Sequence, residues 1–125
     1  MENAAEYTKR REQLNERVLS KADLSMKRFF ALDQDVYSEG ALPKKSKELL
    51  GLVASAVLRC NDCISHHVIE AVGCGATNEE ITEALGIALV VGGSITIPHL
   101  RHAMSLLDTI VPVGDASEDG RTESE

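Results

Sequence analysis

The chain has few basic residues for its number of acidic ones. It carries 13 Lys and Arg against 20 Asp and Glu, which gives a formal net charge of -7 over 125 residues. A general nucleic-acid binder needs a basic face that neutralises phosphates, so this charge balance excludes that class. The chain also lacks a long hydrophobic run, because the longest apolar stretch, residues 84–97, is interrupted by Gly86, Gly92 and Gly93. That stretch is too short to span a bilayer, and we expect no membrane partner.

We also expect no signal peptide. Met1-Glu2-Asn3 opens a polar, charged segment that has no apolar core. We therefore expect a soluble, cytoplasmic protein.

The chain has only three cysteines, which is an odd number. In a reducing compartment, three cysteines that include a CxxC favour catalysis or metal binding over a structural disulfide.

No convincing run alternates between apolar and polar residues, so the predicted fold class is all-α. The capping residues and helix-breaking glycines along the chain indicate a bundle of about six helices. Thr77 and Glu80 form a capping box at the start of the fifth helix, and Gly92-Gly93 ends that helix. The predicted helices cover about residues 4–19, 25–38 and 43–58, a segment from the CxxC to Gly73, then 81–91 and 94–109.

The expected organisation is a single domain with two flanking segments. Residues 1–24 are read as an N-terminal helical extension, residues 25–110 as the domain, and residues 111–125 as an acidic, disordered tail. The predicted third and fifth helices are apolar around most of their circumference, which is more than one small core can cover. We therefore expect a homo-oligomer.

Two thiols and an imidazole lie at helical spacing in the segment CNDCISHH over residues 60–67. Positions three and four apart share a helix face, so Cys60, Cys63 and His67 form one stripe. A cysteine with a pKa near ~8.5 is mostly protonated at neutral pH unless a helix N-terminus or a base lowers that value. Asn61 and Asp62 are capping residues, so a helix that starts here directs its free amides at the sulfurs. The motif predicts a redox or metal site.

Closure of the pair requires a small adjustment of the helix. Cβ atoms at this spacing lie roughly 5 to 6 Å apart in a regular helix, against the ~3.8 Å of a disulfide. A tightened first turn closes that gap, and the pair can then cycle between dithiol and disulfide through a sulfenic acid. In two alternatives, Cys60, Cys63 and His67 are zinc ligands or plain packing residues. The remaining candidates for a zinc site, Cys74, His99 and His102, match no common zinc spacing, so no metal or other cofactor is expected.

Glu48 is the acid most able to reach this stripe. The third and fourth helices should form an antiparallel hairpin that turns near residues 58–61, and positions equally far from the turn then face each other. A continuous helix would instead place Glu48 ~18 Å from Cys60. The alternative is an exposed glutamate that pairs with Lys44 or Lys45.

The combination of Glu48, eleven residues, Cys60-Asn61-Asp62-Cys63, three residues and His67 resembles the signature of the alkylhydroperoxidase D-like branch of the carboxymuconolactone decarboxylase family. The resemblance covers roughly residues 29–107. It includes the Lys-Glu-Leu around Glu48, the turn from Gly73 to Ile81 and the Gly92-Gly93-Ser94 break. It implies an all-α fold that assembles into trimers or hexamers, small single-domain members commonly as hexamers.

The resemblance also implies roles for these residues in a thiol-dependent peroxidase. Cys63 would attack a small hydroperoxide and pass through a sulfenic acid, and Cys60 would donate a proton and then form the disulfide. Glu48 and His67 would be the proton relay that draws the proton from Cys63. The reductant would be a dithiol carrier such as a lipoyl-bearing protein or thioredoxin. Asp62 stands where the better-characterised hydroperoxidase has a histidine, and its negative charge is expected to raise the thiol pKa.

Two other functions stay open at this stage. The first is a lactone decarboxylase, which would depend on histidine and acid groups instead of the thiols, with His66, His99 and His102 as candidates and Arg101 as a carboxylate-binding residue. The second is a redox- or metal-responsive oligomer without enzymatic activity. The sequence identifies neither the substrate nor the reductant.

Overall fold

The computed structural model describes residues 2–110, and within that range the chain is all-α, as predicted. The predicted acidic tail, residues 111–125, lies outside the described residues. The elements are α1 (Ala4–Lys21), α2 (Leu24–Val36), α3 (Lys44–Val57), α4 (Asn61–Gly73), α5 (Asn78–Gly92), a short 3-10 turn η1 (Ser94–Thr96) and α6 (Ile97–Asp108).

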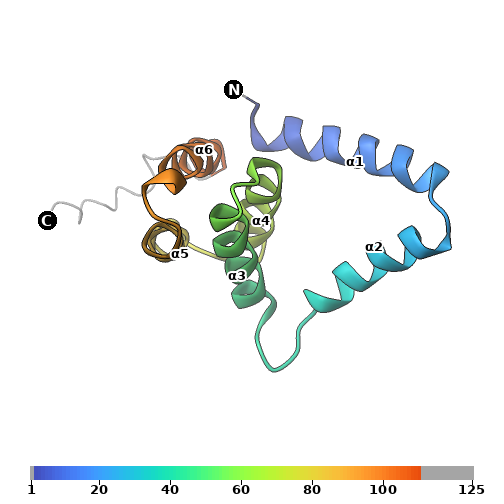
Figure 1. Cartoon of the computed structure of the whole chain (residues 1–125), viewed down its shortest axis with the longest axis horizontal. Coiled ribbons are helices and arrows are strands. Elements are labelled where there is room, and N and C mark those ends of the chain that lie inside the picture. The colour runs from blue at the N-terminus through green and yellow to red at the C-terminus, as the bar shows by residue number, and fades with distance from the viewer. Residues whose placement is uncertain (1, 111–125) are drawn as a thin grey trace, which may run out of the picture.

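Helices α3 to α6 form the packed part of the molecule, and α1 and α2 extend from it as an arm (Figure 1). Helix α3 packs against α4 and α5, while α4 also packs against α6. Each of these helices supplies apolar side chains to one core, so burial of apolar surface holds them together. The fully buried larger apolar residues of this core are Leu52, Ile64, Val68, Ile81, Leu85 and Leu106.

Some helix ends differ from the sequence-based expectation. Helix α2 begins at Leu24, before the predicted residue 25, because it is capped by Asp23, whose Oδ1 accepts the Met26 N–H at 3.0 Å. Helix α3 begins at Lys44 and not at residue 43, because Pro43 is its N-cap. The predicted capping box of α5 is confirmed, because Thr77 Oγ1 accepts the Glu80 N–H at 3.1 Å and Glu80 Oε1 accepts the Thr77 N–H at 3.0 Å.

The turn between α3 and α4 places Cys60 at the start of α4. Arg59 has a φ of 62°, in the left-handed region that glycine adopts most easily. The Cys60 N–H bonds to the Ser55 carbonyl at 3.0 Å and the Arg59 N–H to the Ala56 carbonyl at 3.0 Å, which is a Schellman end for α3. The sharp reversal folds α4 back along α3, as the predicted hairpin requires.

The arm exposes apolar side chains in the single chain. On α2, Phe29 is 67% exposed and Val36 57%, and Met26 and Leu32 are exposed to a similar degree. Helix α5, in the packed part of the molecule, also exposes apolar side chains, with Val90 86% and Val91 67% exposed. No helix within residues 2–110 has the length and apolar character needed to cross a membrane.

Candidate active site between helices 3 and 4

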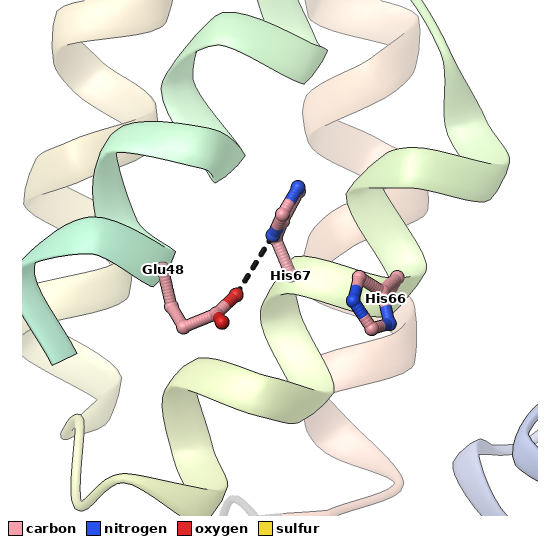
Figure 2. A group of neighbouring side chains, drawn as sticks. All are labelled: Glu48, His66 and His67. Carbon is pink, nitrogen blue, oxygen red and sulfur yellow. Dashed lines mark hydrogen bonds and ion pairs between the residues drawn. The ribbon is translucent and has the colours of Figure 1, made fainter. Parts of the chain in front are cut away.

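The central contact of the site joins Glu48 on α3 to His67 on α4. Glu48 Oε1 lies 2.8 Å from His67 Nδ1 (Figure 2), and the carboxylate is only 2% exposed. Its second oxygen, Oε2, accepts a hydrogen bond from Lys44 Nζ at 2.7 Å. The hairpin therefore brings Glu48 to His67 within one subunit. The pairing with Lys44, which sequence reasoning treated as an alternative, is present at the same time.

The environment of Glu48 fixes which nitrogen of His67 carries a proton. Burial opposes ionisation of Glu48, but hydrogen bonds from His67 and Lys44 outweigh it, so the pKa of Glu48 lies below the usual carboxyl value. An ionised carboxylate only accepts hydrogen bonds, so His67 Nδ1 must be the donor. The unprotonated nitrogen of a neutral His67 is then Nε2. That nitrogen can accept a proton while Glu48 stabilises the cation that forms.

Tyr37 and Gly51 hold the other side of the His67 ring. Tyr37 Oη lies 3.4 Å from His67 Nε2, and the two ring centroids are 5.1 Å apart. Burial, followed by the charges of Asp33 and Glu48, raises the Tyr37 pKa, so its hydroxyl remains a donor. A Cβ on Gly51 would lie 2.7 Å from both His67 Cε1 and Tyr37 Oη. The close approach of α3 to His67 therefore depends on glycine at this position.

Gly51→Ala should displace His67 and Tyr37 and impair both stability and any chemistry that uses the His67 ring. Because the added methyl meets ring atoms at overlapping distance, we expect a loss of about 1 to 3 kcal/mol in the free energy of unfolding. Gly86→Ala is the matched control, since a methyl group on Gly86 of α5 would meet no atom within 4 Å, and it should stabilise by up to about 1 kcal/mol. Urea unfolding of both variants measures the difference. Equal effects of the two substitutions would contradict the proposed close approach.

The two cysteines of the motif are joined as a disulfide, with their Cα atoms 5.3 Å apart. Cys60 is itself the N-cap of α4, and its sulfur accepts the Cys63 N–H at 3.2 Å. The expectation that Asn61 and Asp62 cap the helix is therefore wrong, because both are inside its first turn. The positive end of α4 is directed mainly at the Cys60 sulfur.

Glu48 and His67 are in contact with each other, but they are separated from the sulfurs of Cys60 and Cys63. Cys63 is exposed and Cys60 is half-buried, so Cys63 is not the inner thiol of the pair. No hydrogen bond joins either sulfur to Glu48 or His67 within residues 2–110. Cys63 precedes His67 by one helical turn, a spacing that places side chains ~5 to 6 Å apart on one face. A proton passing from Cys63 to His67 Nε2 would therefore need a bridging water.

A polar cavity of about 360 Å³ opens beside Glu48, between the arm and the hairpin. His66 lines it beside His67 (Figure 2), and the two ring centroids are 5.1 Å apart. Burial lowers the His66 pKa, with Arg11 and His67 adding to the effect, so this imidazole is kept neutral. The other lining residues are Arg11, Asp33, Gln34, Tyr37, Lys44 and Glu70.

One group of side chains in the described part of the chain has the geometry of a metal site. Ligand atoms of Glu48, His66 and His67 all lie within 4.8 Å of one another. The Lys44 ammonium group, 2.7 Å from Glu48 Oε2, supplies the positive charge that this carboxylate needs and opposes a metal cation. The set considered for zinc from the sequence, Cys60, Cys63 and His67, forms no such group in residues 2–110.

The remaining candidates lie apart from the Glu48–His67 contact. His99 Nδ1 lies 2.7 Å from Asn61 Oδ1, and His102 Nε2 lies 2.7 Å from Ser65 Oγ, so both histidines attach α6 to α4. Burial lowers the His102 pKa, although a hydrogen bond with the Asn61 backbone opposes the shift. Cys74 is a free, half-buried thiol at the other end of α4. Arg101 is exposed.

Sequence reasoning missed the two tyrosines. The chain has only two, and both touch the site: Tyr37 at His67, and Tyr7 through a hydrogen bond from its hydroxyl to the Asp62 carbonyl at 2.9 Å. Their scarcity is the one signal that could have singled them out. The contacts themselves join α2 and α1 to α4 over long separations in the chain, so no local pattern predicts them.

Comparison with known proteins gives the same family as the resemblance. The model of the carboxymuconolactone decarboxylase family matches residues 23–106. An uncharacterised protein of the cox locus of Paracoccus denitrificans is 38% identical over 82 residues, which are 66% of this chain and 74% of that protein. A crystal structure of a Thermotoga maritima protein aligns with a TM-score of 0.83 at 55% identity, over 87% of this chain and 96% of that one.

A further Thermotoga maritima crystal structure is of a carboxymuconolactone decarboxylase family protein for which an involvement in the antioxidative response has been suggested. It aligns with a TM-score of 0.79 at 52% identity, over 95% of this chain and 98% of that one.

Proposed function

This chain belongs to the carboxymuconolactone decarboxylase family, and from that premise we propose that it is a thiol-dependent peroxidase of the alkylhydroperoxidase D type. The observation that carries the proposal is the buried Glu48–His67 hydrogen bond, one helical turn from a cysteine pair that is joined as a disulfide. The suggested antioxidative involvement of the similar Thermotoga maritima protein agrees with this chemistry.

The proposed cycle has three balanced steps. The Cys63 thiolate attacks the O–O bond of a hydroperoxide, which releases an alcohol after protonation and leaves Cys63 as a sulfenic acid. The Cys60 thiol then displaces hydroxide from that sulfur, so that a disulfide and one water form. An external dithiol reduces the disulfide by exchange and returns both cysteines to thiols while it becomes a disulfide itself.

The Glu48–His67 pair supplies the proton transfers of this cycle. His67 Nε2 accepts the Cys63 proton through water, and the Nδ1–H stays bonded to the Glu48 carboxylate, which stabilises the imidazolium. Lys44 keeps Glu48 ionised, so the carboxylate does not compete for the proton. The same imidazolium can return its proton to the alkoxide or hydroxide that leaves.

The proposed partners are a small hydroperoxide and a dithiol carrier, either a lipoyl-bearing protein or thioredoxin, in a reducing compartment such as the cytoplasm. Hydroperoxide consumption by the full chain should require one of these carriers together with its reductase. Turnover with dihydrolipoyl protein or thioredoxin supports the proposal. If both carriers reduce the disulfide but no hydroperoxide is consumed, the chain is a disulfide oxidoreductase and not a peroxidase.

We also propose that the chain forms a homo-oligomer, most simply a hexamer. The support is the exposed apolar surface of α2 and α5, where Phe29 is 67% and Val90 86% exposed in the single chain. Sedimentation equilibrium at micromolar concentration should give the mass of six chains, or at least three. Phe29→Glu should shift the protein toward smaller species, and a wild-type monomer would contradict the proposal.

A further inference from the structure

Helix α1 touches the cysteine motif through one buried side chain. Tyr7 is 3% exposed and is the one buried residue of α1. Its hydroxyl donates a hydrogen bond to the main-chain oxygen of Asp62 at 2.9 Å and lies 3.4 Å from Asp62 Oδ2. Asp62 is one of the two residues between Cys60 and Cys63. The first helix of the chain is therefore anchored at the turn that holds the two sulfurs.

Arg10 adds a charge to the same contact. Its Nη2 lies 3.4 Å from Asp62 Oδ1, and its Nε lies 2.8 Å from Glu2 Oε2. The guanidinium carbon is 5.3 Å from the centroid of the Tyr7 ring, so the anchored tyrosine also orients the arginine. Tyr7, Arg10 and Asp62 form one unit, which we call the α1 clamp.

The clamp falls partly outside the segment that the family model matches. That segment begins at residue 23, whereas α1 ends at Lys21. Resting on the proposed thiol chemistry, we propose that the α1 clamp tunes the Cys60–Cys63 pair, with Tyr7 and Arg10 as positioning residues that hold and offset the negative charge of Asp62 beside the sulfurs.

The charges around the motif give the direction of the effect. A carboxylate near a thiol disfavours the thiolate, and a guanidinium close to that carboxylate reduces the penalty. Other ionisable groups near this turn are Glu2, which shares Arg10, and Arg59, which directly precedes Cys60. Helix α6 adds His99, which bonds to Asn61, and His102, which is close enough for Asp62 to influence its pKa. Burial, and next the charge of Asp62, raise the pKa of Tyr7 to about 12, so its hydroxyl remains a donor wherever the cysteines titrate.

Alkylation of the reduced protein tests the clamp without any peroxide. In a Cys74→Ser background, the rate with iodoacetamide at pH 7 should fall about two- to fivefold in Arg10→Gln, the range expected of an exposed ion pair. Arg10→Lys should keep most of the wild-type rate, and Asp62→Asn should raise it. In the Asp62→Asn background, Arg10→Gln should have no effect. Arg17→Gln, the same charge change at an exposed position of α1, is the matched control.

Tyr7→Phe tests the anchor separately, because it keeps the ring and removes only the hydroxyl. Tryptic cleavage after Arg10 and Arg11 should become about two- to tenfold faster, and the alkylation rate should fall as it does in Arg10→Gln. The proposal is overturned if neither Tyr7→Phe nor Arg10→Gln changes alkylation, or if Arg10→Gln has the same effect with and without the Asp62 carboxylate. Failure of peroxide turnover alone would refute the proposed function but would leave these rates interpretable.

Discussion

Cys63→Ser should abolish hydroperoxide turnover, whereas Cys60→Ser should permit a single turnover that stops at a sulfenic acid on Cys63. The reason is that Cys63 is exposed to substrate and lies one turn before His67, while Cys60 is the half-buried N-cap of α4. Initial rates with a dithiol carrier measure the first effect. Trapping of the sulfenic acid with dimedone, followed by mass spectrometry, measures the second.

Cys74→Ser is the control for this pair, because Cys74 is a free thiol at the far end of α4 and should be dispensable. The N-terminus of α4 favours a thiolate at Cys60, so there is also a physical reason for Cys60 to be the attacking thiol. Equal residual activity in the two serine variants, or a sulfenic acid on Cys60, would refute Cys63 as the attacking thiol. Lactone decarboxylation that survives both substitutions would identify the alternative enzyme class.

Glu48→Gln should slow peroxide turnover by about 10²-fold or more, because glutamine keeps the shape of the side chain but cannot stabilise an imidazolium at His67. The Cys63 pKa should rise in this variant, and alkylation of reduced Cys63 at neutral pH should slow with it. Steady-state kinetics and the pH dependence of iodoacetamide labelling are the two measurements. Glu16→Gln, at an exposed position of α1, is the charge-matched control.

The same substitution should change how stability depends on pH. The pKa of Glu48 is lowered in the folded protein, so its contribution to stability is present above the unfolded carboxyl pKa of about 4.3 and is lost as pH falls through the folded value. At pH 7 we expect Glu48→Gln to cost about 1 to 3 kcal/mol, since the buried carboxylate has two charge-assisted partners. Urea unfolding should show this difference shrinking below about pH 4. A difference that is constant with pH would show that Glu48 is not ionised in the fold.

The helices could be predicted from local rules, whereas the pairing of Glu48 with His67 was allowed by the predicted hairpin and favoured over an exposed glutamate by the family resemblance. Helical periodicity gives the elements, and the predicted reversal near residues 58–61 places α3 and α4 antiparallel. The capping box at Thr77 and the break at Gly93 could also be read directly.

The features that were missed depend on three-dimensional packing. Arg59 ends α3 in a conformation for which glycine is the usual signal, so the position of the turn could be predicted but its Schellman conformation could not. Cys60 occupies the cap because the Schellman turn delivers it there, although Asn61 and Asp62 have better capping propensities. Tyr37 and Tyr7 come from the arm. They are far from the α4 residues in the sequence, so no helical spacing links them to the site. The close approach of α3 at Gly51 involves His67 and Tyr37, and Glu48 of the same helix is only 2% exposed.

A single-turnover mass measurement tests whether hydroperoxide converts the Cys60–Cys63 dithiol to a disulfide. Fully reduced full-length protein is mixed with one equivalent of hydroperoxide, digested without reductant and analysed by mass spectrometry. We expect one equivalent of alcohol and a loss of two hydrogens in the peptide that contains Cys60 and Cys63, with Cys74 still alkylatable. A cysteine pair that stays reduced while the hydroperoxide persists, or while Cys74 is oxidised, would contradict it.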